Sequence, residues 1–254
     1  MEKGDACLPA QHVFSKWKKT RVLQNSSLKR YIPETAVYNS SSLSDMLNRY
    51  NMVYVKPDKG THGKGVMRAK RRSKGSFELR EGVSTKVFPS VNQLHAGIKS
   101  RIGKRKYLVQ KGIQMMNHRG RKFDLRVLIQ KNLSNKWEAM SILGRRAAAN
   151  KIVTNVSNGG SMESLSTLLR PHMNKASIRK LRRKLNQMGL SAGKRLSKKY
   201  KGIKQLGLDI ALDKNMRPWI LEVNTTPAIY VYRTFNPSAY RRIRRYAQAY
   251  GRFK

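Results

Sequence analysis

The sequence predicts an α+β protein with two lobes, because strand-like and helix-like segments are mixed in two separate blocks. The first block covers residues 16–110 and the second covers residues 111–254, while residues 1–15 are expected to form a mobile leader. A chain of 254 residues is long enough to bury a real core in this arrangement. A hydrophobic content of 39%, in patterned Val, Ile and Leu segments, excludes a disordered basic tail.

The first block begins with helical, loop-rich residues and continues as short strands. A cluster of serines at 40–42 is expected to cap a helix over Leu43–Tyr50. Strands are then expected at Val53–Lys56, Gly65–Ala69, Ser76–Arg80 and Thr85–Phe88, a helix at Val91–Ile102, and a closing strand at Tyr107–Gln110.

The second block contains longer strands and a polar loop that reaches Gly160. The strands are expected at Phe123–Gln130, Trp137–Gly144, Leu208–Leu212 and Trp219–Val223, and the helices at 162–170, 175–188 and Ser238–Tyr250. The helix at 175–188 has an apolar stripe that can be buried while its bases face solvent.

The charge of the chain is its most unusual property. It contains 55 Lys and Arg against 13 Asp and Glu, a formal net charge of +42. Such a charge indicates either solvated basic faces or a polyanionic partner, such as nucleic acid, an acidic protein or an anionic polymer. No apolar run is long enough to span a membrane and the N-terminus does not resemble a signal peptide. One cysteine, Cys7, fits a reducing compartment, so a soluble cytoplasmic protein is expected.

The few carboxylates near the C-terminus suggest a metal site. If Leu208–Leu212 and Trp219–Val223 form a hairpin about the turn between them, Asp209 lies directly opposite Glu222. Asn224 projects on the same face as Glu222, because side chains alternate along a strand. Two carboxylates and an amide oxygen suit Mg²⁺. The alternative is that nearby lysines and arginines neutralise both acids.

A glycine-rich loop follows the strand that ends in Lys56. Gly60, Gly63 and Gly65 let backbone N–H groups approach a phosphate closely, and Lys56 supplies a positive charge. The loop does not match the Walker pattern. An ordinary glycine-rich hairpin turn remains the alternative.

Two further segments carry charged residues at regular spacing. In Phe123-Asp124-Leu125-Arg126, alternation puts Asp124 and Arg126 on one face of a strand. They form either a simple ion pair or a site for a nucleotide and its transferring phosphoryl group. Another arginine pair, Arg145-Arg146, precedes a polar loop that ends at Gly159-Gly160. The five histidines lack ligand spacing, which argues against zinc.

In this order the segments resemble the ATP-grasp superfamily, especially its YheC/YheD-like group, described as endospore-coat-associated. The matching segments are Val55-Lys56-Pro57 with its glycines, Tyr107–Gln110, Phe123–Arg126, Arg146 with Asn155 and Gly159-Gly160, Leu208–Ile210, and Leu221–Pro227. The most specific feature is an Asp thirteen residues before a Glu-x-Asn-x-x-Pro run. The resemblance implies two α+β lobes that hold ATP between their sheets.

The resemblance also implies a role for each candidate residue. ATP would be bound by Lys56, Gly60, Gly63, Gly65, Gln110, Lys111, Gly112 and Asp124, with the adenine edge at the inter-lobe hinge formed by residues 110–112. Mg²⁺ would be held by Asp209, Glu222 and Asn224, and the catalytic residues would be Arg126, Arg146 and Asn155.

The expected activity is therefore ATP- and Mg²⁺-dependent ligation of a carboxylate to an amine or similar nucleophile through an acylphosphate. An acidic peptide, protein or polymer is the expected substrate or partner, with nucleic acid as a further candidate. The alternative is a basic polyanion-binding or spore-coat scaffold protein that retains an ATP-grasp shell with little catalysis. Two departures from the family are expected to matter: no full N-terminal substrate domain precedes the first lobe, and Lys111 replaces a commonly acidic hinge residue.

Overall fold

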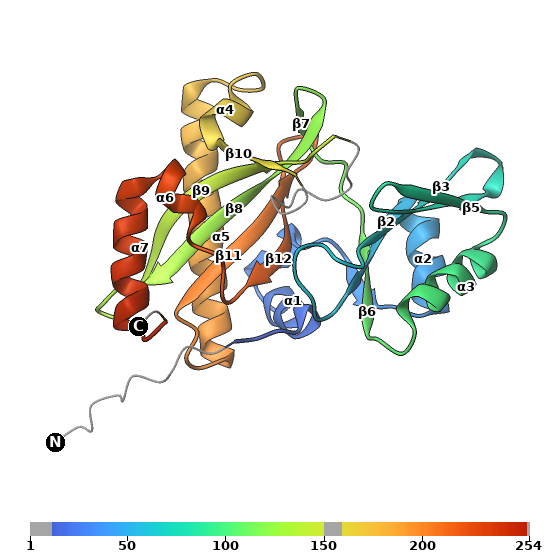
Figure 1. Ribbon diagram of the computed structural model, residues 1–254, viewed down its shortest axis with the longest axis horizontal. Helices are drawn as coiled ribbons and strands as arrows, with labels where there is room; N and C mark the ends of the chain where they lie inside the picture. Colours follow the sequence, from blue (N-terminus) through green and yellow to red (C-terminus); the bar gives the residue numbers. More distant parts are fainter. Residues whose placement is uncertain (1–11, 150–158, 253–254) are drawn as a thin grey trace.

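A computed structural model of the chain, describing residues 12–149 and 159–252, has two antiparallel sheets that form neighbouring lobes (Figure 1). The first sheet has the strand order β1-β6-β2-β3-β4-β5. The second has the order β10-β9-β8-β11-β12, with β7 paired to β8. This arrangement matches the predicted two-lobed α+β architecture.

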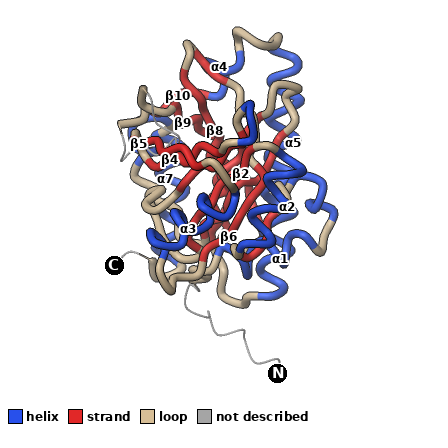
Figure 2. Tube along the Cα trace, turned by 90° about the vertical axis from the view of Figure 1, so that its right-hand side faces the viewer, coloured by secondary structure: helices blue, strands red, loops and turns tan. Residues whose placement is uncertain are grey.

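The first lobe consists of six short strands and two helices. Its strands are β1 (Thr35–Val37), β2 (Met52–Pro57), β3 (Met67–Arg71), β4 (Phe77–Glu81), β5 (Ser84–Phe88) and β6 (Tyr107–Lys111), and its helices are α2 (Ser40–Tyr50) and α3 (Val91–Ile102). Alternate residues such as Val53, Val55 and Val109 point toward α2 and α3, which bury them. The two helices lie side by side on this lobe (Figure 2), so its opposite face is left for the cleft.

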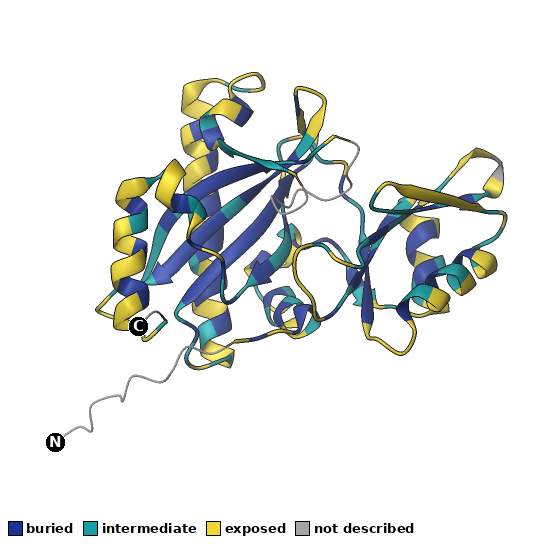
Figure 3. Ribbon diagram, in the orientation of Figure 1, coloured by how far each residue is buried: buried dark blue, intermediate teal, exposed yellow. Residues whose placement is uncertain are grey.

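The second lobe has longer strands and a helix layer on each face. Its strands are β7 (Asn117–His118), β8 (Arg121–Lys131), β9 (Trp137–Arg146), β10 (Ser161–Ser164), β11 (Gln205–Leu212) and β12 (Pro218–Asn224), and its helices are α4 (Leu165–Leu169), α5 (Lys175–Lys199), α6 (Val231–Phe235) and α7 (Pro237–Ala249). One face packs on α5 and the other on α6 and α7. The central strands are therefore buried, whereas the outer surfaces of the helices are exposed (Figure 3).

Helix α5 is longer than the sequence predicts, because two glycines in it have a packing role. The sequence analysis ends this helix at residue 188, whereas the observed helix continues through Gly189 and Gly193, although glycine has a low helix propensity. A Cβ at Gly189 would lie 2.8 Å from Ile129, and one at Gly193 would lie 2.7 Å from Ile129 and 2.8 Å from Trp137. These glycines let α5 approach β8 and β9 closely and continue to Lys199. None of the described helices is both long and apolar enough to cross a lipid bilayer.

Two other segments also differ from the sequence prediction. The expected helix at 162–170 is divided into β10 and the short helix α4. Helix α2 begins at Ser40 rather than Leu43, and its cap is Asn39. The Asn39 side chain accepts a hydrogen bond from Ser42 N, while Ser42 Oγ accepts one from Asn39 N. This reciprocal capping box explains why the serines lie inside the helix.

The N-terminal residues pack on the second lobe, although the sequence analysis grouped them with the first. Helix α1 (Lys16–Gln24) and the short 3₁₀ helix η1 (Ser27–Tyr31) contribute Leu23 and Leu28 to the core beside α5 and β12. Residues 12–15, which we expected to belong to the mobile leader, also contact folded parts of the protein. Val13 is buried, and its N–H donates to Thr225 Oγ1 at 3.0 Å.

Asp58, which directly follows β2, attaches α1 to the first lobe. Its carboxylate is 4% exposed and accepts bonds from Ser15 Oγ at 2.9 Å and Trp17 N at 2.8 Å. Ser15 is also the N-cap of α1, since its Oγ accepts from Lys18 N. An anionic carboxylate at a helix N-terminus is favoured by the helix dipole. The two lobes are thus connected by α1 as well as by the chain between β6 and β8.

We expect Ser15→Ala to lower the free energy of unfolding by about 1–2 kcal/mol, because it removes both the cap and a bond to buried Asp58. Ser41→Ala is a matched control, since Ser41 also bonds an aspartate, Asp45, at an exposed position. Its effect should stay within about 0.5 kcal/mol. Urea unfolding of both variants tests this, and equal losses would refute a special role for the Ser15–Asp58 bond.

Candidate functional site

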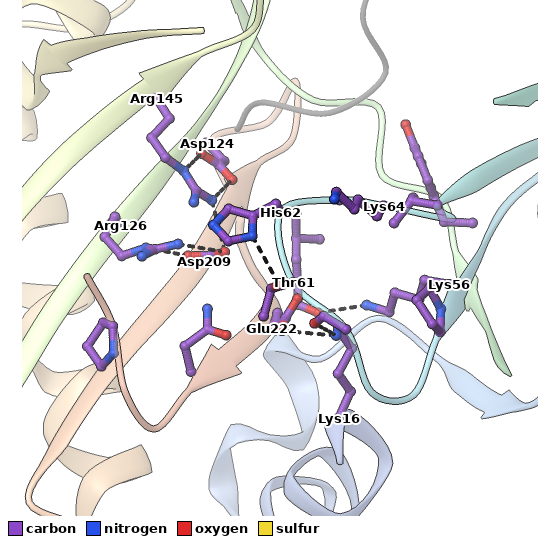
Figure 4. A pocket seen from close by; sticks show the side chains of 18 of the residues that line it. Lys16, Lys56, Thr61, His62, Lys64, Asp124, Arg126, Arg145, Asp209 and Glu222 are labelled. Atoms are coloured by element: carbon purple, nitrogen blue, oxygen red, sulfur yellow. Dashed lines mark hydrogen bonds and ion pairs between the residues drawn. The ribbon is translucent and has the colours of Figure 1, made fainter. Parts of the chain in front are cut away.

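A cavity of about 490 Å³ lies between the two sheets and is lined by residues of both lobes. The cleft face of the first sheet contributes Tyr54, Lys56 and Gln110, and the loop after β2 extends toward the second sheet (Figure 4). The second sheet contributes the acidic residues Asp124, Asp209 and Glu222 together with Arg126 and Arg145, and β12 adds Asn224. The cavity therefore brings together residues far apart in the sequence.

Strand register places the charged residues of the second sheet opposite one another. Asp124 on β8 faces Arg145 on β9, and Arg126 on β8 faces Asp209 on β11. Asp209 in turn faces Glu222 on β12, as the hairpin analysis predicts. The hairpin differs from the prediction only beyond Asp209, where an irregularity next to Ile210 shifts the register by one residue.

The arginines form cross-strand ion pairs with the aspartates. Arg126 Nε and a terminal nitrogen of Arg126 donate to Asp209 at 2.6 and 3.1 Å. Arg145 donates to Asp124 at 2.9 and 2.5 Å and approaches Asp209 Oδ2 at 2.9 Å. The ion pair considered within Asp124-Leu125-Arg126 is therefore absent from the described contacts, because each residue pairs across the sheet instead.

These contacts determine the ionisation of Asp209. Its burial tends to raise the carboxyl pKa, but Arg126 and Arg145 outweigh that effect and hold the pKa below its ordinary value. Burial lowers the pKa of Arg145, but Asp124 and Asp209 outweigh this effect and raise the pKa well above its ordinary range. Asp209 and Arg145 thus both remain charged at neutral pH.

Lys56 extends from β2 toward the second lobe. Its ammonium donates to Gln110 Oε1 at 2.8 Å and to the carbonyl of Leu221 on β12 at 3.0 Å. Both partners are neutral, and burial lowers the Lys56 pKa to about 8. Lys56 is therefore a buried cation without a direct carboxylate partner among its described contacts, which makes it suited to meet an anion.

The glycine-rich loop after Lys56 uses backbone conformations that favour glycine. Gly63 and Gly65 have φ of 73° and 71°. A Cβ at Gly65 would lie 2.6 Å from the Tyr107 hydroxyl, so this position also requires close packing. Gly60 and Gly63 line the cavity, whereas Gly65 does not and instead packs beside Tyr107.

Lys16 is a site residue that the sequence analysis did not select. Its Nζ donates to the carbonyl of Gly60 at 2.8 Å and lies 3.4 Å from Glu222 Oε1 (Figure 4). It reaches this position because Asp58 holds the first turn of α1 beside the loop. Only the basic cluster at residues 16–19 marks Lys16 in the sequence, and such clusters are common throughout this chain.

The hinge residues differ in what they present to the cavity. Gln110 and Lys111 line it, but Gly112 does not, and its N–H donates to the Met52 carbonyl at 2.9 Å. The Lys111 ammonium lies over the rings of Tyr50 and Trp219, at 4.6 and 5.4 Å from their centroids. Lys111 therefore has a packing role where an acidic residue was expected from the family.

Of the two predicted catalytic residues that the structure describes, Arg126 lines the cavity and Arg146 does not. Arg146 lies outside it and pairs with Glu163 at 3.2 Å, whereas its neighbour Arg145 points inward. Because adjacent strand residues point to opposite faces, only one arginine of this pair can do so. Asn155 lies outside the described residues.

The donors at Asp209, Glu222 and Asn224 fit a magnesium ion. Mg²⁺ is commonly held by one or two carboxylates together with substrate phosphates and water, so three His, Cys, Asp or Glu ligands are not required. No such group of three occurs within residues 12–149 and 159–252. Asp209 accepts one bond at Oδ1, which leaves a lone pair there for a metal. Neighbouring lysine and arginine side chains also neutralise Asp209 and Glu222. The structure therefore fits both interpretations of these acids, as metal ligands and as members of ion pairs.

The model of the YheC/D-like ATP-grasp family matches residues 7–253. Two endospore coat-associated proteins of Bacillus subtilis are similar in sequence. YheD is 26% identical over 227 residues, which cover 86% of this chain and 49% of YheD. YheC is 25% identical over 217 residues, which cover 84% of this chain and 59% of YheC. The chain thus spans about half the length of these curated relatives.

Solved structures of ATP-grasp enzymes share the fold. D-cycloserine synthetase DcsG superimposes with a TM-score of 0.59 at 10% identity, covering 93% of this chain and 70% of DcsG. N5-carboxyaminoimidazole ribonucleotide synthetase PurK, solved with ADP, gives 0.54 at 12% identity over 92% of this chain and 51% of PurK. D-alanyl-alanine synthetase A of Vibrio cholerae gives 0.51 at 13% identity, over 84% and 56% of the two chains. These similarities, which concern the fold alone, confirm the predicted ATP-grasp architecture.

Replacing Arg145 by Ala should destabilise the protein by about 3–5 kcal/mol, because Asp124 would remain buried without its partner. Arg146→Ala, at the neighbouring position, should cost about 1 kcal/mol or less, since it removes a more exposed pair with Glu163. Chemical unfolding measures both values. Equal effects would show that the buried network does not depend on Arg145.

Proposed function

The chain belongs to the YheC/D-like ATP-grasp family, and we propose that it is an ATP- and Mg²⁺-dependent ligase that joins a carboxylate to an amine or similar nucleophile. The observation that carries this proposal is the cleft itself. Lys56 and the glycine-rich loop approach from one sheet, while Asp209, Glu222 and Asn224 face them from the other. Cations for phosphates and hard oxygen ligands for a metal thus line one cavity.

Each part of the cleft has a distinct task in this proposal. Lys56 and Lys16 bind the phosphates of ATP, and Gly60 and Gly63 allow the loop to cover them. Adenine lies at the hinge beside Gln110 and Lys111. Asp209, Glu222 and Asn224 hold Mg²⁺, which when bound neutralises charge on the phosphate oxygens. Asp124 lines the nucleotide side of the cleft, but its carboxylate is already engaged by Arg145, so its contribution is to orient that arginine.

The proposed reaction has two steps. A substrate carboxylate oxygen attacks the terminal phosphorus of ATP, ADP leaves, and an acylphosphate forms. An amine then attacks the acyl carbon, inorganic phosphate leaves, and the amine loses a proton as the amide forms. Arg126 borders the cavity beside Asp209 and stabilises charge on the transferring phosphoryl group. Closure of the lobes limits hydrolysis of the acylphosphate.

A second candidate function is supported by the basic surface. All ten Lys and Arg residues of α5 are exposed, and a ligase for a small molecule does not need them. The alternative is therefore a polyanion-binding or spore-coat scaffold protein with little catalysis. Both B. subtilis relatives are named as endospore coat-associated. Spore association is compatible with either candidate, so the two are separated by catalysis rather than by location.

The decisive experiment measures ATP turnover with acidic peptides and amino acids and detects amide products by mass. Asp209→Asn and Glu222→Gln should each reduce Mg²⁺-dependent turnover by about 100-fold or more, because each removes a hard metal ligand. Asp213→Asn is a control, since Asp213 is in the same hairpin but bonds the turn and Trp219. Full turnover in either cleft variant would refute the metal assignment. Polymer binding without ADP release by the wild-type chain would favour the scaffold.

The charge of Lys56 predicts a specific pH dependence. Its pKa of about 8 means that the ammonium form predominates below that pH and is lost above it. ATP affinity should fall as the pH rises through about 8, by at most about tenfold per pH unit, while adenosine affinity stays constant. Lys56→Arg keeps its charge and should lose this dependence. Calorimetric titration with both ligands tests it, and parallel changes for ATP and adenosine would exclude Lys56 as the phosphate contact.

A further inference from the structure

A second hollow lies between α1 and α5, outside the catalytic cleft. Its volume is about 710 Å³, and five of the residues that line it are basic. These are Lys18, Arg21, Arg195, Lys198 and Lys199. Within the part of the chain that the structure describes, no acidic residue lines it, and we refer to it as the basic groove. Closely spaced like charges repel one another and lower the stability of the folded chain, and an anionic partner would relieve this repulsion.

The bases of the groove are available for binding. All five side chains are exposed, and within the described residues none forms an ion pair. Arg195 donates to the carbonyl of Asn25 at 2.8 Å, which joins the end of α5 to the end of α1. Since both walls are helices packed on the core of the second lobe, the groove is held in shape by the fold.

Helix α5 continues the positive surface beyond the groove. Its 25 residues contain ten Lys and Arg and no Asp or Glu. These basic residues form two groups, at 175–184 and 194–199, separated by about 15 Å at about 1.5 Å per residue. An extended polypeptide covers that gap with about five residues at about 3.3–3.6 Å per residue. A single extended segment can therefore reach both groups.

The composition of the groove favours one class of polyanion. Sites for single-stranded nucleic acid combine basic residues with several aromatic side chains on which nucleobases stack. Among the described residues, Tyr200 is the one aromatic side chain that lines this groove. A second copy of the chain is disfavoured, because each copy carries a net charge of +42. Carboxylates need no stacking surface and pair well with Arg and Lys.

We infer that the basic groove is a docking site for an acidic, Glu- or Asp-rich segment of another polypeptide. Carboxylates of the extended segment bind Arg21 and Arg195 at the groove and the lysines beside them, and the segment continues along α5. This docking is independent of ATP chemistry in the cleft, so it applies whether the chain is a ligase or a scaffold. It also gives a function to bases that the proposed reaction does not use.

The test measures binding of a fluorescein-labelled oligoglutamate to the full chain by fluorescence anisotropy at two salt concentrations. The triple variant Lys18→Gln, Arg21→Gln, Lys198→Gln should weaken binding by about tenfold or more at low salt, and the loss should shrink at high salt. The matched control is Arg241→Gln, Arg242→Gln, Arg244→Gln, which removes three exposed charges from α7. It should weaken binding by less than about threefold.

Equal losses in the two triple variants would overturn the inference, because they would indicate attraction to the overall charge. The inference would also be overturned, in favour of nucleic acid, if an oligothymidylate of equal charge bound more tightly than oligoglutamate and its binding were lost in the groove variant. ATP affinity and thermal unfolding should match wild type in the groove variant. A loss of either would show that the substitutions damage α1 rather than remove a docking contact.

Discussion

The register of the second sheet is the constraint on which the cleft depends. Four neighbouring strands, β9, β8, β11 and β12, place Asp124 opposite Arg145, Arg126 opposite Asp209, and Asp209 opposite Glu222. A shift of one residue in any strand would move its charged side chains into the apolar core against α5. The alternation of apolar residues along β8 therefore fixes both the core and the site, since Phe123, Leu125 and Val127 occupy the opposite face.

The contact of α1 with the glycine-rich loop provides a second constraint. Asp58 binds the first turn of α1, and Lys16 in that turn reaches both Gly60 in the first lobe and Glu222 in the second. Lys56 makes a further contact across the cleft with the Leu221 carbonyl. The lobes are thus coupled through polar contacts at the cavity rather than through a shared apolar core, because their buried clusters are separate.

Local sequence patterns were sufficient for the hairpin but not for the contacts between distant segments. The facing of Asp209 and Glu222 follows from a short turn and strict alternation, so it could be predicted. Which of Arg145 and Arg146 points into the cavity depends on the pairing of β9 with β8, and no local sequence pattern specifies that pairing. Lys16 contacts a residue more than two hundred positions away, and the length of α5 depends on packing at Gly189 and Gly193. In each of these cases tertiary packing overrides local propensity.

In the proposed function, Asp209 and Glu222 would bind a metal while they also form ion pairs with basic side chains, and the charges of the cleft bear on both roles. Three acids line the cavity, Asp124, Asp209 and Glu222, against six basic residues, Lys16, Lys56, Lys64, Lys111, Arg126 and Arg145, a balance of +3. Arg126 and Arg145 hold the pKa of Asp209 below its ordinary value, and an ionised carboxylate is the form that binds Mg²⁺. This positive balance favours an anionic ligand over a neutral one. In the proposed function, the basic residues around Asp209 therefore prepare the site for a metal-bound phosphate and need not compete with it.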